Sequence, residues 1–191
     1  MDKIDEKWYA EDGSEIKRVL RIVTIILIVA MAAWGVGLWM NERHVPQLPG
    51  EVILKGNMSF EEAEGKLLDD GYIPRGEAIK DGADIHRYYE SSEAFGYQAR
   101  GSMLALIQSR GRYFIFDHYF REEDGGHNAE NPGDIFNAVQ EQLTGIIGTA
   151  PREQKSDVFG KVWIWNLQGK TEIGIFYGRE DMVTVRYAYI R

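Results

Sequence analysis

Residues 102–120 read SMLALIQSRGRYFIFDHYF, and this stretch decides the fold more than any other. Two runs rich in apolar and aromatic residues, Ser102 to Gln108 and Arg112 to Phe120, flank the short sequence Ser109-Arg110-Gly111. Runs of this length around a glycine-containing turn are typical of a β-hairpin. The centre of the chain is therefore predicted to be part of an antiparallel sheet.

An amphipathic helix is predicted on each side of this hairpin. The first begins at Ser59, which forms a capping-box pattern with Glu62, and ends at Gly71. The second covers Asp134 to Ile147 and ends at Gly148, a residue type that favours the left-handed helix stop. Further strands are predicted at Ile85–Tyr89, Lys161–Leu167, Thr171–Tyr177 and Met182–Ile190.

The same short motif, Gly-x-x-Pro-Arg, follows both helices, which suggests an internal repeat. Gly71-Tyr72-Ile73-Pro74-Arg75 follows the first helix, and Gly148-Thr149-Ala150-Pro151-Arg152 follows the second. A second correspondence is expected between residues 107–116 and 167–176, because Ile-Gln and Ile-Phe in the first are matched by Leu-Gln and Ile-Phe in the second. The repeat units would be 57–120 and 131–191, each a helix followed by about three antiparallel strands.

An apolar run from Ile22 to Met40 contains no charged residue. At about 1.5 Å per helical residue it would cover roughly 28 Å, close to the hydrocarbon thickness of a bilayer. A transmembrane helix is therefore predicted over 22–40. Lys17, Arg18 and Arg21 precede the run, so the positive-inside rule places residues 1–21 in the cytoplasm.

A cleaved secretory signal is the alternative for this run, because Ala30-Met31-Ala32 has the small-x-small form of a cleavage site. The apolar character continues beyond that point and includes Trp34 and Trp39, which favours an anchored helix. Ala33 and Gly37 form a small-xxx-small pair on which a second membrane helix could pack.

The rest of the chain is then predicted to lie outside the cytoplasm. Residues 41–56 contain Pro46, Pro49 and Gly50 with little periodicity, which indicates a stalk. Residues 57–191 form the domain. The fold class expected is α+β, with one N-terminal transmembrane helix followed by an extracytoplasmic domain of two helices packed on an antiparallel sheet, and a tandem repeat as an open question. A single-pass protein of a bacterial cell envelope fits this organisation.

Composition excludes several classes of function. The chain carries 22 Lys and Arg against 30 Asp and Glu, a net charge of −8, which argues against nucleic acid as a partner. It contains no cysteine, so disulfides, thiolate nucleophiles and cysteine-based metal sites are excluded. No cofactor is expected.

The domain resembles the β-lactamase-inhibitor-protein-like and BamE-like architecture of tandem units, each a helix laid on an antiparallel sheet. The resemblance is based on Met58-Ser59-Phe60-Glu61-Glu62 at the first helix start and on the two Gly-x-x-Pro endings. It implies an exported protein that binds other proteins through a sheet face or loops, without catalysis. The chain departs from these families by lacking the disulfides of the first and the lipid-anchoring cysteine of the second.

Aromatic residues of two strands are the candidates for a binding surface. Trp163 and Trp165 share one face of their strand, and Tyr187 and Tyr189 share one face of the last strand. An aromatic sheet face left open would bind a protein or peptide partner. The alternative is that these side chains fill the core.

Two other functions stay open at this stage. Asp117, His118 and His127 lie where histidines and carboxylates gather, so a small envelope enzyme or a metal-binding protein is one alternative. The segment has neither the HExxH spacing nor the calcium-loop pattern, which favours a solvated acidic loop that caps a helix. An accessory subunit recognised through Ala33 and Gly37 of its membrane helix is the other. A non-enzymatic binding module anchored in a membrane is the function expected.

Overall fold

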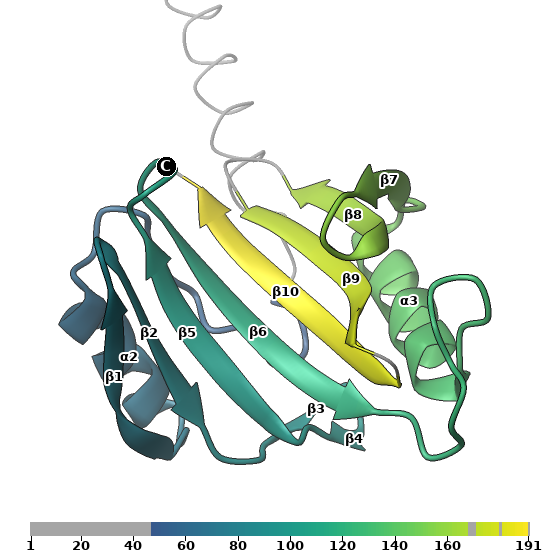
Figure 1. Ribbon diagram of the computed structural model, residues 1–191, viewed down its shortest axis with the longest axis horizontal. Helices are drawn as coiled ribbons and strands as arrows, with labels where there is room; N and C mark the ends of the chain where they lie inside the picture. Colours follow the sequence, from purple (N-terminus) through teal and green to yellow (C-terminus); the bar gives the residue numbers. More distant parts are fainter. Residues whose placement is uncertain (1–46, 168–170, 180, 191) are drawn as a thin grey trace, which may run out of the picture. The chain divides into compact units, whose positions relative to one another are not determined.

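The computed structural model describes residues 47–167, 171–179 and 181–190. An eight-stranded antiparallel sheet dominates this part of the chain, in the order β1-β2-β5-β6-β10-β9-β8-β7 (Figure 1). Strands β3 and β4 form a small separate hairpin. The elements are α2 (Phe60–Asp69), β1 (Pro74–Asp81), β2 (Asp84–Tyr89), β3 (Glu93–Ala94), β4 (Tyr97–Gln98), β5 (Gly101–Ile107), β6 (Tyr113–Arg121), α3 (Asp134–Ile147), β7 (Arg152–Ser156), β8 (Gly160–Leu167), β9 (Thr171–Arg179) and β10 (Met182–Ile190).

The expected fold class is corrected by this architecture. The described chain is mostly one large sheet, accompanied by two short helices of 10 and 14 residues. Among the described residues no helix is long and apolar enough to cross a membrane. The run 22–40, with Ala33 and Gly37, lies outside the described residues, as do residues 1–21.

The two predicted helices and the predicted hairpin are confirmed. Ser59 caps α2: its hydroxyl accepts from the Glu62 amide at 3.1 Å, and the Glu62 carboxylate accepts from the Ser59 amide at 2.7 Å. Helix α3 ends at Gly148, whose φ of 77° is left-handed. Strands β5 and β6 pair antiparallel from Gly101–Tyr119 to Ile107–Tyr113.

The order of strands is symmetric about the central β6–β10 pair. In each half a helix is followed by four strands of the large sheet, and the last strand of each half lies at the centre of that sheet. About three strands per half were predicted from the sequence. Strands β1 and β7, which begin at the ends of the two Gly-x-x-Pro motifs, were not predicted. The expected correspondence of 107–116 with 167–176 is wrong, because β5–β6 occupies the position of β9–β10 and not of β8–β9.

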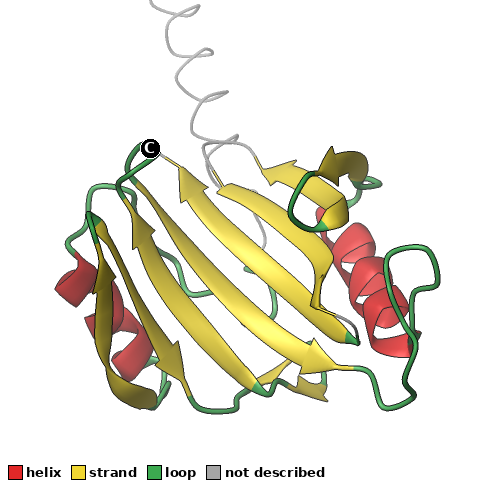
Figure 2. Cartoon of the chain, in the orientation of Figure 1, coloured by secondary structure: helices red, strands yellow, loops and turns green. Residues whose placement is uncertain are grey.

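One face of the sheet carries the hydrophobic core. It packs against α2, α3 and the segment 47–56, and in the view of Figure 2 the sheet lies in front of α2. Successive side chains of a strand point to opposite faces, so alternate residues of β6 and β10 enter this core. On this face, the buried residues of these two strands are Phe114, Phe116, His118, Phe120, Val183, Val185, Tyr187 and Tyr189.

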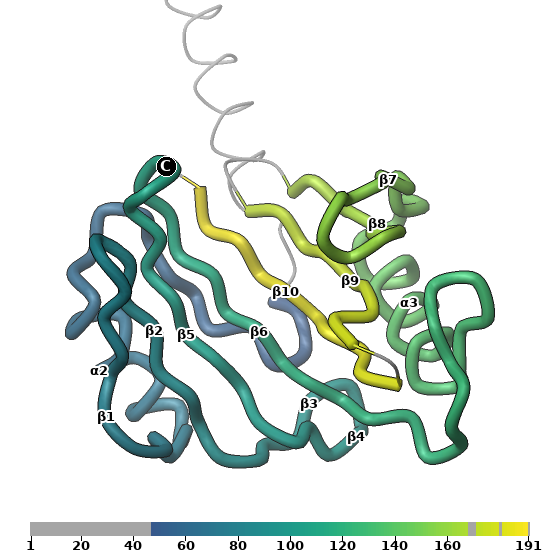
Figure 3. The backbone as a smooth tube through the Cα atoms, viewed as in Figure 1, coloured from purple at the N-terminus to yellow at the C-terminus, as the bar shows by residue number. Residues whose placement is uncertain are grey.

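The segment expected to be a stalk belongs to the domain over its described part, 47–56. Its apolar residues Leu48, Val52 and Leu54 are buried in the core. Figure 3 shows its backbone passing behind the central strands. Its proline and glycine content indicated a spacer, but its three apolar residues find partners on strands far away in the sequence.

Candidate functional site

The structure places the predicted aromatic surface on the core side of the sheet. Trp165, Tyr187 and Tyr189 are buried, and their exposed fractions do not exceed 3%. Trp163 is half-buried and meets Phe136 of α3 edge-on, with 4.9 Å between ring centroids. Because α3 and the segment 47–56 cover this face, Trp165, Tyr187 and Tyr189 fill the core, and Trp163 packs against it.

The tyrosines of β10 hold the segment 47–56 by their hydroxyl groups. Tyr187 donates to the carbonyl oxygen of Pro49 at 2.7 Å, and Tyr189 donates to that of Val52 at 2.6 Å. Trp165 has a comparable role, because its indole N–H donates to the carbonyl oxygen of Thr149 at 3.0 Å. These polar groups satisfy backbone carbonyls that would otherwise be buried without partners.

The structure does not bring Asp117, His118 and His127 together. Asp117 and His118 are neighbours on β6 and therefore point to opposite faces of the sheet. His127 lies in the loop after β6, where its backbone amide donates to the Asp181 carboxylate at 2.7 Å. Within the described residues no group of three or more His, Cys, Asp or Glu could hold a metal ion.

His118 instead joins two parts of the core. Its Nε2 lies 2.8 Å from the carbonyl oxygen of Gly50, and its Nδ1 lies 2.9 Å from the Ser102 hydroxyl. A carbonyl oxygen only accepts, so Nε2 carries the proton and Nδ1 accepts from Ser102. Burial lowers the pKa of His118 from 6.5 to about 4, which keeps the ring neutral. Both side chains are fully buried, so this serine–histidine pair, which the sequence did not indicate, has a structural role.

The acidic loop after β6 does cap a helix, through one buried residue. The Glu122 carboxylate accepts from the backbone amides of Ile135 and Phe136, both at 3.0 Å, and from the Tyr177 hydroxyl at 3.2 Å. The cap position of α3 is Gly133, which has no side chain to bond the free amides. A carboxylate 11 residues earlier therefore replaces the usual local cap.

The opposite face of the sheet, the open face, has no described helix over it and is centred on an ion pair. Arg186 of β10 donates from Nε and Nη2 to the two carboxylate oxygens of Asp117, at 2.8 and 2.7 Å. The guanidinium also lies 5.5 and 5.1 Å from the ring centroids of Phe159 and Phe176. Asp117 is only 1% exposed, and burial raises the pKa of its carboxyl while Arg186 opposes that shift.

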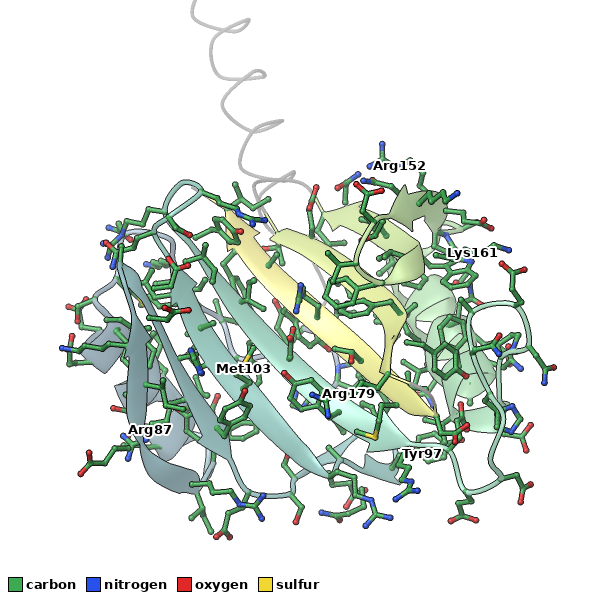
Figure 4. All side chains as sticks on the ribbon, viewed as in Figure 1. Arg87, Tyr97, Met103, Arg152, Lys161 and Arg179 are labelled. Atoms are coloured by element: carbon green, nitrogen blue, oxygen red, sulfur yellow. The ribbon has the colours of Figure 1, made fainter. Side chains whose placement is uncertain are left out.

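A row of cross-strand partners runs through this pair from one edge of the open face to the other. On the N-terminal side Asp117 pairs with Met103, Met103 with Tyr88, and Tyr88 with Arg75. On the C-terminal side Arg186 pairs with Gly174, Gly174 with Ile164, and Ile164 with Arg152. Figure 4 shows Met103 near the middle of the sheet and Arg152 at the β7 edge. We call these eight residues the central row: Arg75, Tyr88, Met103, Asp117, Arg186, Gly174, Ile164 and Arg152.

The central row contains a hollow at Gly174, which has no side chain between Arg186 and Ile164. A pocket of about 210 Å³ opens there. Phe159, from the turn between β7 and β8, forms part of its wall. Its other main lining residues are Val162, Ile164, Phe176, Arg186 and Glu172. We call this space the Gly174 pocket.

A larger pocket of about 860 Å³ lies beside Arg121, the last residue of β6. Its walls are polar and of mixed charge, and include Arg75, Arg100, Arg121, Glu90, Glu123 and Asp181. Glu122 also lines it, so four carboxylates face three guanidinium groups.

The chain matches no protein family model, no curated protein and no solved structure. The resemblance to the inhibitor-protein-like and BamE-like architecture stays a prediction.

Proposed function

We propose that this chain is a non-enzymatic binding protein that holds a protein or peptide partner on the open face of its sheet. The observation that carries the proposal is the central row, in which Tyr88, Met103 and Ile164 flank an Asp117–Arg186 pair whose carboxylate is buried. The binding surface proposed here lies on the opposite side of the sheet from Trp163, Trp165, Tyr187 and Tyr189.

The composition of the open face supports contact with another protein. Tyr88 is 41% exposed, and Met103, Tyr113 and Tyr119 are half-buried. Tyrosine and methionine are enriched in interface cores, because tyrosine buries a large area at low entropic cost and methionine adapts to a partner's shape. The paired strands beneath them hold these side chains in a fixed arrangement.

The same geometry favours binding over catalysis. Both carboxylate oxygens of Asp117 are occupied by Arg186, so Asp117 is not poised as a general base. His118 and Ser102 are buried on the other face, out of reach of a substrate on the open face.

The localisation at a cell membrane is part of the proposal. It is supported by the uncharged run 22–40 and by Lys17, Arg18 and Arg21 before it. Leu48 is buried in the domain, which leaves only residues 41–47 as a spacer after the run. At about 3.5 Å per extended residue such a spacer reaches roughly 25 Å, so we expect the partner at or near a membrane surface.

Cross-linking of the full-length chain in its native membrane, followed by mass spectrometry, tests the proposal. The open-face variant Tyr88→Glu/Met103→Glu places two charges on the proposed surface. The control Leu68→Glu adds one such charge at an exposed apolar residue of α2, on the other side of the sheet. We expect a specific partner to be lost only from the open-face variant while its circular dichroism stays native. An unchanged set of cross-linked proteins in a folded open-face variant would contradict the proposal.

A further inference from the structure

We infer that the edge strand β7 pairs antiparallel with β7 of a second copy of this chain, around a two-fold axis at Gln154. The sheets of the two copies then continue into each other. This inference concerns an edge of the sheet and the proposed function concerns its open face, so neither depends on the other.

Strand β7 has one free side. It pairs with β8 only, and no other described segment forms a backbone hydrogen bond with it. Figure 1 shows it at the end of the sheet. Its residues from Arg152 to Lys155 are exposed. A strand in this position presents free N–H and C=O groups, which a strand of another chain can bond.

The two edges of the sheet differ in how regular they are. Strand β1 begins with Pro74, its register with β2 shifts between Arg75 and Ile79, and Gly76 between them has a left-handed φ of 73°. Prolines and bulges of this kind prevent an edge from pairing with another chain. Strand β7 contains neither, and its register with β8 is continuous from Arg152 to Ser156. The β7 edge is therefore the one that can extend the sheet.

The charges of β7 are complementary to those of an identical strand. In a two-fold antiparallel pair centred on Gln154, Glu153 of each copy lies opposite Lys155 of the other, on one face of the sheet. A shift of the centre by one residue places Glu153 opposite Glu153, or Lys155 opposite Lys155. The sequence of β7 therefore favours a single register, and the strand that completes it is a second β7.

Lys155 needs such a partner, because its neighbour within the chain has the same charge. It lies directly opposite Lys161 of β8, and like charges at this position destabilise a sheet. Lys161 is paired with Glu130 at 3.0 Å and with Glu153 at 3.8 Å. Lys155 itself forms no ion pair with any described residue. Glu153 of a second copy supplies the missing negative charge.

A disulfide across the axis tests the pairing on the full-length chain in detergent micelles. The chain has no cysteine, so Gln154→Cys introduces its only thiol. Directly opposite residues have Cα atoms about 4.5 to 5.5 Å apart, which a disulfide can bridge. The control Arg152→Cys lies on the same edge and face, but the register separates its two copies by about 14 Å. We expect Gln154→Cys to form disulfide dimers at least about tenfold faster than the control under mild oxidation, as measured by non-reducing electrophoresis.

Charge exchange tests the register. In the Gln154→Cys chain, Glu153→Lys or Lys155→Glu alone places like charges opposite each other, which should slow dimer formation by about tenfold or more. A mixture of these two variants has opposite charges at both positions, so mixed dimers should form as fast as dimers of the parent chain. A purification tag on one variant identifies the mixed dimers. Altered folding of either variant cannot produce this recovery, because each chain is unchanged by mixing.

Equal rates for Gln154→Cys and Arg152→Cys would overturn the inference. A mixture of the two charge variants that dimerises no faster than either variant alone would overturn it equally. Circular dichroism checks that each variant is folded, and all the substituted residues are exposed. The partner test at Tyr88 and Met103 is independent, so a partner lost there without a β7 dimer contradicts only this inference.

Discussion

The two halves of the sheet place different side chains on the same framework. In the central row Tyr88 and Met103 of the N-terminal half occupy the positions that Ile164 and Gly174 occupy in the C-terminal half. One half thus presents filled aromatic and thioether surface, and the other presents a pocket. The pocket depends on Gly174 and also on Phe159, which comes from the turn between β7 and β8.

The halves also meet through complementary charges. Asp117 comes from the last strand of the N-terminal half, and Arg186 comes from the matching strand of the C-terminal half. Each occupies the central position of a nine-residue strand, so a single ion pair marks the centre of the symmetry. The predictions below test how strongly the two halves depend on this pair and on the features that distinguish them.

Removal of Arg186 is expected to have the largest effect. Arg186→Ala leaves the Asp117 carboxylate buried without its partner, which should lower the free energy of unfolding by about 3 to 5 kcal/mol. Urea unfolding at neutral pH measures this change. The double variant Asp117→Leu/Arg186→Leu removes both charges and should recover most of the loss. A loss below about 1 kcal/mol in Arg186→Ala would show that the pair does not join the halves.

Acidification should destabilise the N-terminal half through His118. Its pKa is lowered from 6.5 to about 4 in the folded chain, so the unfolded chain binds more protons between these two values. The stabilisation is therefore complete above pH 6.5 and falls as the pH drops to about 4, by about 3 kcal/mol in all. Unfolding curves recorded across this range measure the slope. His118→Gln can bond both Gly50 and Ser102 without titrating, so the free energy of unfolding of this variant should depend less on pH between 6.5 and about 4. An identical pH dependence in the two chains would contradict the role given to His118.

The two helix caps should differ in strength. Glu122→Ala leaves two buried amides of α3 without an acceptor and should cost about 2 to 3 kcal/mol. Ser59→Ala removes a local, exposed cap of α2 and should cost about 1 kcal/mol. Thermal or urea unfolding of both variants gives the comparison. Equal losses would mean that the distant carboxylate adds nothing beyond an ordinary cap.

This contrast also shows what the sequence could and could not predict. The cap of α2 was visible because Ser59 and Glu62 lie three residues apart, whereas the cap of α3 depends on a carboxylate brought close by folding. The edge strands β1 and β7 were missed because PRGEAIKD and REQKS are polar and have no alternation. Edge strands need little apolar character, since they have a neighbour on one side only.

For the candidate site, the face of the sheet was harder to predict from the sequence than the strands themselves. Strand β10 places Val183 and Tyr187 on one face, but its other face, with Met182 and Ala188, is also largely apolar. Alternation alone therefore could not show which face the helices cover. That choice is decided by contacts between distant segments, such as the bond from Tyr187 to Pro49. The aromatic residues chosen from the sequence lie on β8 and β10, and the surface proposed above is on the other face of these strands.

The smallest expected effect concerns Gly174 and has the opposite sign. Gly174→Ala adds a Cβ atom that makes only ordinary contacts, and it restricts the unfolded chain. It should raise the free energy of unfolding by about 0.5 to 1 kcal/mol, which thermal unfolding against the wild-type chain measures. A stabilising substitution at a buried strand position indicates that the glycine is kept for a reason other than folding, in line with the usual conflict between stability and binding sites. Met103→Gly, the matching change in the other half, should destabilise the chain, because it opens a hollow where a side chain now packs. If Gly174→Ala destabilised the chain instead, the hollow would be a requirement of packing, and the difference between the halves would carry no information about binding.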